Sequence, residues 1–289
     1  MLEASGISKT YAGGVAALSE VSITAGAGVF GLLGPNGAGK SSLMRTLATL
    51  QRPDTGRVLL NGRDLLADPQ AARARIGYLP QDMGVYPRVS AREMLDYLAG
   101  LRGISGMARR REVALLLERV NLADVADRRL DTYSGGMRRR FGIAAAFLGA
   151  PEMVIVDEPT AGLDPTERRR FQLLLAEAAQ GCVLILSSHI VEDLAGLCRD
   201  MALIRGGRIV ASGAPAVLVA RLEGQVWQRQ ADFAELPGLR ARHGTLSWRP
   251  ERGGLTVRLV AETDPGDDFA PGAPDLEDLY AAHIGTAAA

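Results

Sequence analysis

Residues 34–41 read Gly34-Pro35-Asn36-Gly37-Ala38-Gly39-Lys40-Ser41, which has the form G-x-x-x-x-G-K-[S/T]. This is the Walker A pattern, in which glycines let backbone N–H groups crowd around a phosphate. An apolar run at residues 28–33 precedes it and predicts a buried strand, and residues 42–50 follow with helical spacing of apolar side chains. Strand, glycine loop and helix form the context that the motif requires, and the helix points its positive end at the same anion.

Within this stretch, Lys40 can reach the β- and γ-phosphates of a nucleotide, and Ser41 can hold Mg²⁺. Ser42, where the loop runs into the helix, is also expected to bind nucleotide. Lys9 and Lys40 are the only lysines in a chain that otherwise uses arginine. Because a compact ammonium suits a phosphate better than a planar fork, Lys40 favours a nucleotide site over a chance glycine-rich turn.

A second apolar run, at residues 153–156, ends in the carboxylates Asp157 and Glu158. This is the Walker B form, in which the strand aims Asp157 at Mg²⁺ and leaves Glu158 beside it to orient an attacking water. Paired acids at a strand end can also be merely solvated. The Walker A motif upstream favours the functional interpretation.

The composition limits the class of protein. The chain has 289 residues, enough for one large or two modest domains. Its 33 basic and 33 acidic residues balance, so the whole chain has no electrostatic footprint for nucleic acid. Cys182 and Cys198 are expected as two buried thiols in a reducing compartment rather than as a disulfide.

No membrane segment is predicted. The N-terminus lacks a basic-then-apolar signal segment, and the apolar stretch 141–156 is interrupted at residues 149–152, too soon for a membrane span. We therefore expect a cytoplasmic protein that touches a membrane only through a partner or its surface.

The pattern along the chain predicts an α/β fold. Residues 2–11 and 17–24 alternate apolar and polar and predict antiparallel strands before the phosphate loop. From about residue 85 to 150 the pattern turns helical, with Ser90 and Glu93 as a capping box, and predicts a helical insertion. A further helix is expected from Glu192.

The remaining segments predict a closing hairpin and a small appendix. Residues 201–213 carry a glycine pair at their centre, which is typical of a β-hairpin. After about residue 220 the signal weakens, and we expect a small α+β appendix with strands at 224–230 and 255–260 and a helix at 276–284.

Four further features are ambiguous when each is taken alone. Tyr11 could stack on an adenine ring or fill a local core. Gln81, just after a predicted strand, could meet a ligand or be an exposed loop glutamine. His189 follows the apolar strand 182–188, where a lone histidine is usually only a polar terminus. In a doubly wound sheet, however, that strand should end on the same edge as the phosphate loop.

The fourth feature is Ser134-Gly135-Gly136, which opens a predicted helix. A serine cap with exposed N–H groups makes a second possible anion site, although Ser-Gly-Gly is also a common turn.

Taken in order, these motifs resemble the ATP-binding subunits of ABC transporters over about residues 1–220. The features that carry the resemblance are Walker A, Gln81, Ser134-Gly135-Gly136, Walker B, Asp164 and His189. The Ser-Gly-Gly signature separates this family from other P-loop proteins. The resemblance implies a P-loop ATPase fold with a mixed sheet, an antiparallel β subdomain and a helical insertion at about 85–150. Residues 221–289, beyond the resemblance, are expected to form a small accessory domain.

The resemblance also implies roles. Tyr11 would stack on adenine, Gln81 would contact Mg²⁺ or the lytic water, Glu158 would be the catalytic base, and His189 would contact the γ-phosphate. Ser134, Gly135 and Gly136 would bind the γ-phosphate of ATP held by a second ATPase subunit, with Asp164 at the subunit contact. The implied assembly is a head-to-tail dimer, expected to be a homodimer, that sandwiches two Mg-ATP and sits on integral membrane permease subunits at the inner face of the membrane.

The signature departs from the commonest form, Leu-Ser-Gly-Gly-Gln, because Tyr133 and Met137 stand at its ends. This chain therefore lacks the side chain of the final glutamine, whereas the backbone anion site needs only the middle three residues. Tyr-Ser-Gly-Gly-Met is similar to a branch of bacterial exporters, and residues 274–280 look like that branch's C-terminal helix. The alternatives are an importer motor or a soluble ABC-type ATPase that acts on DNA, ribosomes or Fe–S assembly.

Overall fold

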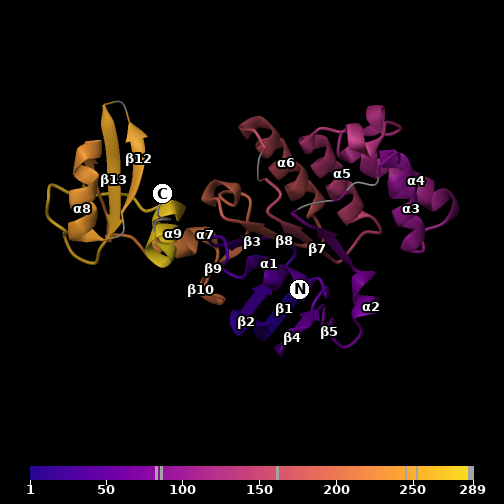
Figure 1. The fold of residues 1–289 in the computed structure, drawn as a ribbon, viewed down its shortest axis with the longest axis horizontal. Coiled ribbons are helices and arrows are strands. Elements are labelled where there is room, and N and C mark those ends of the chain that lie inside the picture. Colours follow the sequence, from indigo (N-terminus) through magenta and orange to yellow (C-terminus); the bar gives the residue numbers. More distant parts are fainter. Residues whose placement is uncertain (82–83, 85–86, 161–162, 245, 252, 286–289) are drawn as a thin grey trace.

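The computed structural model describes residues 1–81, 84, 87–160, 163–244, 246–251 and 253–285. Figure 1 shows three adjoining parts: an α/β centre, a helical part on one side of it, and a C-terminal sheet with its helices on the other. Among the described helices, none is both long and apolar enough to span a bilayer.

Six strands form the central sheet in the order β10-β9-β3-β8-β7-β6, and β10 alone runs antiparallel to its neighbour. Every residue of β7 and β8 is buried, as expected where helices and a second sheet cover both faces. The predicted apolar runs are therefore strands, and the parallel strands end on one edge. The bounds are β3 (Gly28–Leu33), β6 (Ile76–Leu79), β7 (Met153–Asp157), β8 (Val183–Ser188), β9 (Asp200–Arg205) and β10 (Arg208–Gly213).

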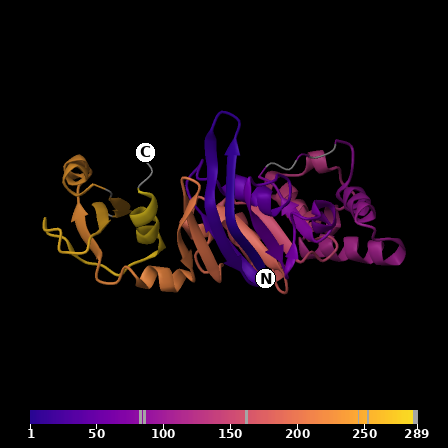
Figure 2. The same cartoon turned by 90° about the horizontal axis from the view of Figure 1, so that it is seen from below.

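A four-stranded antiparallel sheet, in the order β2-β1-β4-β5, packs on one face of the centre. Its strands are β1 (Leu2–Tyr11), β2 (Val15–Ala25), β4 (Thr55–Leu60) and β5 (Arg63–Asp64). Figure 2 shows the long hairpin of β1 and β2 projecting beyond the central sheet. Helix α1 (Lys40–Leu47) lies between the two sheets and buries Leu43, Met44 and Leu47 completely, whereas α2 (Pro69–Arg73) is a short connector.

The helical part packs on the opposite face of the central sheet through one continuous core. The predicted capping box is confirmed: the Ser90 hydroxyl accepts from the Glu93 N–H, and the Glu93 carboxylate accepts from the Ser90 N–H. The expected start of the insertion at residue 85 lies outside the described residues. The elements are α3 (Ala91–Leu101), α4 (Gly106–Arg119), η1 (Ala123–Val125), η2 (Leu130–Thr132), α5 (Gly135–Phe147) and α6 (Pro165–Ala178).

The helix expected from Glu192 is wrong. A single 3₁₀ turn, η3 (Val191–Asp193), forms instead. Gly196 adopts a left-handed φ of 74°, which a helix cannot continue through. Asp193 also directs its side chain inward to Ser188 and Thr160, which ties the turn to the sheet edge.

The C-terminal part has its own antiparallel sheet in the order β12-β13-β11-β14 and its own apolar core, which includes Leu239 of α8 and Leu255 and Val257 of β13. The strands and the helix expected in this region are confirmed. The elements are α7 (Pro215–Ala220), β11 (Val226–Ala231), η4 (Phe233–Glu235), α8 (Leu236–His243), β12 (Ser247–Glu251), β13 (Gly254–Val260), β14 (Ala270–Pro271) and α9 (Leu276–Ile284).

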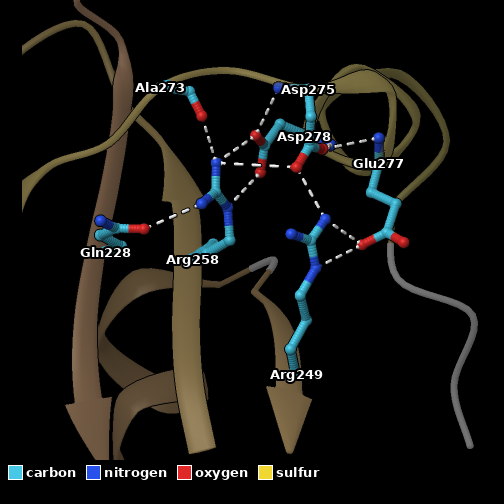
Figure 3. A network of polar contacts seen from close by, with 7 residues as sticks. All are labelled: Gln228, Arg249, Arg258, Ala273, Asp275, Glu277 and Asp278. Carbon is cyan, nitrogen blue, oxygen red and sulfur yellow. Dashed lines mark hydrogen bonds and ion pairs between the residues drawn. The ribbon is translucent and has the colours of Figure 1, made fainter. Parts of the chain in front are cut away.

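A buried ion pair fastens α9 to this sheet, as Figure 3 shows. Arg258 of β13 donates from Nε and Nη2 to Asp278 of α9 over 3.0 and 2.7 Å, and the two residues are 7% and 1% exposed. The hydrogen bonds to Asp278 raise the pKa of Arg258. Gln228 and the carbonyl of Ala273 accept two further hydrogen bonds, so each of the three guanidinium nitrogens has a partner.

Helix α9 also contacts the centre of the molecule. It packs against α7, β9 and η3. Arg205 of β9 donates to the His283 carbonyl over 2.9 Å. The C-terminal sheet is thus linked through α9 to the turn that follows His189.

Candidate functional site

The phosphate loop leaves β3 and begins α1 at Lys40. Two of its glycines are required by close backbone approach: a Cβ on Gly34 would lie 2.3 Å from the Ile204 carbonyl, and one on Gly39 would lie 2.5 Å from the Ala17 carbonyl. Gly39 also has a left-handed φ of 106°. Strands β2 and β9 therefore support the flanks of the loop, while its tip at Asn36 and Gly37 is exposed.

Lys40 is buried at the base of this loop, with only 4% of its side chain exposed. Its Nζ donates to the carbonyls of Gly34 and Pro35 over 2.7 and 3.1 Å. The same Nζ lies 3.0 Å from Glu158 Oε1. The ammonium group of Lys40 thus donates two hydrogen bonds within the loop, and its charge is paired with the Walker B carboxylate.

Glu158 lies between Lys40 and His189. Its second oxygen, Oε2, is 3.2 Å from His189 Nδ1, and the two side chains are 11% and 37% exposed. Its backbone is left-handed, with φ of 46°, a conformation that stores strain in a residue with a side chain. The structure thus brings together three predicted site residues that are 118 and 31 positions apart along the chain.

A hydroxyl bridge connects the ends of β7 and β8. Ser187 donates to Asp157 Oδ1 over 2.6 Å and accepts from the Glu158 N–H over 2.9 Å. The sequence analysis did not single out Ser187. The feature of the sequence that could have revealed it is the pair of serines at the end of an otherwise apolar strand.

The metal ligands expected here are the hydroxyl of Ser41, the side chain of Gln81 and the carboxylate of Asp157, which is 4% exposed. The described residues contain no cluster of three or more His, Cys, Asp or Glu that could hold a metal ion. Mg²⁺ is commonly bound by one or two protein oxygens together with substrate phosphates and water, so hard oxygen donors beside a phosphate loop fit this ion.

Tyr11 is not a core residue, because 38% of it is exposed. Its hydroxyl donates to Gln51 Oε1 over 2.8 Å and lies 3.1 Å from Ser42 Oγ. Gln51 Nε2 in turn donates to the Ser42 carbonyl and to Thr46 Oγ1 over 2.8 and 2.9 Å. Tyr11 is therefore anchored to the first turn of α1, and Gln51 is a neighbour that the sequence did not reveal.

Gln81 comes two residues after β6, the strand beside β7, and is exposed at the same edge of the sheet. No hydrogen bond or ion pair between described residues joins it to Lys40 or Glu158.

The Ser-Gly-Gly segment faces outward. Ser134 and Gly135 are exposed, and Ser134 caps α5 by accepting from the Met137 N–H over 3.2 Å. The two departures from the common signature serve packing: Tyr133 is 3% exposed and donates to the Val125 carbonyl over 2.7 Å, and Met137 packs against the core.

Gly136 is close-packed, because a Cβ there would lie 1.7 Å from a carboxylate oxygen of Glu167. Asp164 caps α6 by accepting from the N–H groups of Thr166 and Glu167, both over 2.9 Å. Within the described chain, neither Ser134 nor Asp164 is bonded to the phosphate loop.

A phosphate loop between β3 and α1, with Walker B carboxylates on the same sheet edge, defines a nucleoside triphosphatase of the P-loop class. Residues 18–161 match the family model described as ABC transporter. The daunorubicin/doxorubicin resistance ATP-binding protein DrrA of Streptomyces peucetius is 37% identical over 227 residues, which are 78% of this chain and 68% of that protein. The doxorubicin resistance ATP-binding protein DrrA of Mycobacterium tuberculosis is 36% identical over 267 residues, 91% of this chain and 81% of that protein. The chain belongs to the ABC transporter family as an ATP-binding subunit, and it is an ATPase.

Solved structures agree on the fold. A structure of the ATP-binding subunit of an ABC transporter is 27% identical and covers 76% of this chain and 92% of that one, with a TM-score of 0.69. A dimeric structure of a bacterial ABC transporter cassette, 22% identical, covers 74% of this chain and 98% of that one, with a TM-score of 0.67. The predicted P-loop ABC ATPase fold is confirmed.

Proposed function

We propose that this chain is the motor subunit of an ABC exporter, in which Mg-ATP binding closes a head-to-tail dimer and hydrolysis reopens it to drive separate permease subunits. The observation that carries the proposal is that the predicted nucleotide-binding residues lie in two separate groups on this chain. Lys40, Glu158 and His189 form one half at the sheet edge. Ser134 and Gly135 are exposed elsewhere on the described surface, and no hydrogen bond joins Ser134-Gly135-Gly136 to that half. A second copy would complete each half.

The Lys40–Glu158 pair suggests how the site works. The γ-phosphate of ATP carries more charge than one carboxylate and would replace Glu158 at Lys40. The released carboxylate of Glu158 can then accept a proton from the attacking water, while His189 holds its other oxygen in place. When bound, Mg²⁺ neutralises charge on the phosphates, with Ser41 and Asp157 as its protein ligands and Gln81 beside the ion or the water.

The nucleoside and the partner subunit take the outer positions. The exposed ring of Tyr11 would stack on adenine, with its hydroxyl held by Gln51. The N–H groups that open α5, at Ser134-Gly135-Gly136, would bind the γ-phosphate of ATP held by the other subunit, and Asp164 would lie at the contact. The solved bacterial ABC transporter cassette that shares this fold is a dimer, which supports such an assembly.

Export is favoured by the names of the relatives, which are drug-resistance ATP-binding proteins, and by the Tyr-Ser-Gly-Gly-Met signature. In this proposal residues 1–220 are the ATPase domain and residues 221–289 an accessory domain. The chain works as a homodimer on the inner face of the membrane, held there by its permease, and it binds no nucleic acid.

The proposal is tested by purifying the tagged chain from membranes in mild detergent and identifying bound proteins by mass spectrometry. We expect an integral membrane permease. We also expect inside-out vesicles containing the pair to take up fluorescent doxorubicin, the drug in the names of two relatives, only with Mg-ATP. Copurification of ribosomes or DNA would contradict a transport role. A strict requirement for an external substrate-binding protein would instead identify an importer.

A further inference from the structure

Asp193 is a buried carboxylate that belongs to neither nucleotide motif. It ends η3, and only 1% of it is exposed. An ionised carboxylate is unfavourable in a protein interior unless hydrogen-bond donors and cations surround it. The partners of Asp193 are therefore informative about its purpose.

One oxygen of Asp193 joins two loops of the site. Oδ2 accepts from Thr160 Oγ1 over 2.5 Å and from Ser188 Oγ over 2.9 Å. Thr160 comes two residues after Glu158, and Ser188 immediately precedes His189. The same carboxylate oxygen thus connects the segments that bring Glu158 Oε2 and His189 Nδ1 to 3.2 Å.

The other side of Asp193 faces α6. Its Oδ1 lies 3.4 Å from Arg168 Nε, and its backbone carbonyl accepts from Gln172 Nε2 over 3.1 Å. Oδ1 and the Arg168 Nε form an ion pair without a hydrogen bond in the described part of the chain. The close contacts of the carboxylate are therefore those to Thr160 and Ser188, and Arg168 supplies the compensating charge.

A support of this kind is needed because Glu158 is strained. Its left-handed backbone persists only where the surroundings restrain both of its flanks. Ser187 holds the Glu158 N–H on one flank. Asp193 holds Thr160 on the other flank.

We infer that Asp193 is a positioning residue for hydrolysis, which keeps Glu158 and His189 aligned by tying their loops together. Asp193 touches neither the phosphate loop nor Lys40 in the described structure, so its loss leaves nucleotide binding intact. The inference rests on the roles proposed above for Glu158 and His189.

The first test compares Asp193→Asn with Asp278→Asn in the 289-residue chain. Both aspartates are 1% exposed and paired with an arginine, but Asp278 lies in the C-terminal part. Asp193→Asn should lower kcat about tenfold to a hundredfold. The amide has one oxygen and one NH2 group, so it cannot accept from Thr160 and Ser188 and also present an oxygen to Arg168. The side chain must therefore shift, and a misplacement of about 1 Å lowers the rate by that order. The Kd of a fluorescent Mg-ATP analogue should change by less than about twofold. Asp278→Asn should lower the Tm and leave kcat unchanged.

Two further variants separate positioning from general stability. Thr160→Val removes one hydroxyl at nearly constant volume and should also lower kcat. This variant tests the positioning role if Asp193→Asn does not fold. In a His189→Ala background, Asp193→Asn should lower kcat little further, because residues that act as one unit are not additive.

An unchanged kcat in Asp193→Asn would overturn the inference, and so would an unchanged kcat in Thr160→Val if Asp193→Asn does not fold. It would also be overturned if the fold-loss of kcat in the double variant with His189→Ala equals the product of the two single losses. The failure of the proposed function looks different. It would appear as an absence of Mg-ATP hydrolysis by the unmodified chain, or as normal hydrolysis by Glu158→Gln.

Discussion

Lys40 of the phosphate loop and Glu158, which follows β7, form an ion pair with 3.0 Å between Nζ and Oε1. Their side chains are 4% and 11% exposed. The group expected to receive the phosphate is therefore neutralised by the group expected to activate water. Because opposite charges in a poorly hydrated site attract strongly, an incoming phosphate has to compete with Glu158 for Lys40. The carboxylate would become available as a base only after nucleotide has arrived.

Glu158→Gln should separate binding from hydrolysis. The amide keeps the shape of the side chain but cannot accept the proton, so kcat should fall about 10²- to 10⁴-fold. Mg-ATP should bind at least as tightly, because Lys40 loses its anionic competitor, and the protein should accumulate as an ATP-bound dimer. Phosphate release and gel filtration with and without Mg-ATP measure both effects. Normal turnover would reject Glu158 as the base.

Lys40→Ala should weaken Mg-ATP binding itself. Losing a charge-assisted contact of about 1.5–3 kcal/mol corresponds to roughly a 10- to 150-fold rise in Kd. Lys9→Ala is the matched control, because it removes the only other lysine of the chain. The Nζ of Lys9 lies 2.9 Å from Asp54 Oδ1, and neither residue belongs to the phosphate loop. Isothermal titration gives both Kd values. Equal ATP affinity in the two variants would count against the phosphate-loop interpretation.

Tyr11→Ala should weaken the binding of ATP but not of inorganic triphosphate, because an aromatic ring stacked on a base is worth about 1–3 kcal/mol. Tyr11→Phe keeps the ring and loses the bonds to Gln51 and Ser42, so most of the ATP affinity should remain. Competition against a fluorescent nucleotide measures each ligand. If Tyr11→Ala weakens both ligands equally, the tyrosine acts on the loop and not on adenine.

Of the two thiols expected to be buried, Cys182 is buried and Cys198 is half-buried, with its sulfur packed against Gly31. The thiol of Cys198 should therefore react slowly in the folded protein. Burial raises its pKa to about 12, whereas the pKa of an unfolded cysteine is about 8.5. The folded state therefore disfavours the thiolate. The contribution of this thiol to the free energy of unfolding should be fully present below about pH 8.5 and should decline as the pH rises toward the pKa of the folded state. At pH 8 a thiol-reactive label should modify Cys198 only after denaturant is added. The Cys198→Ala variant shows which part of the labelling comes from this cysteine. Rapid labelling of native Cys198 would contradict this burial.

Local chemistry explains why much of the fold was predictable. The apolar runs that became β3, β7 and β8 are continuous because both faces of a parallel sheet are covered. The glycines of the phosphate loop and the capping box at Ser90 are local signals that need no knowledge of the tertiary structure. The expected helix after Glu192 was wrong because its polar residue, Asp193, turns inward to partners on two other segments.

The sequence by itself determined the nucleotide loop, the Walker B acids, the Ser-Gly-Gly turn and the apolar runs that form β3, β7 and β8, since each depends on residues adjacent in the chain. Only the tertiary structure decided that Lys40 pairs with Glu158, that Gln51 anchors Tyr11, and that Asp193 joins the loops of Glu158 and His189. These contacts depend on which strands lie side by side in the sheet. Hydrophobic periodicity states which face of a segment is buried, but it does not state which distant segment will cover that face.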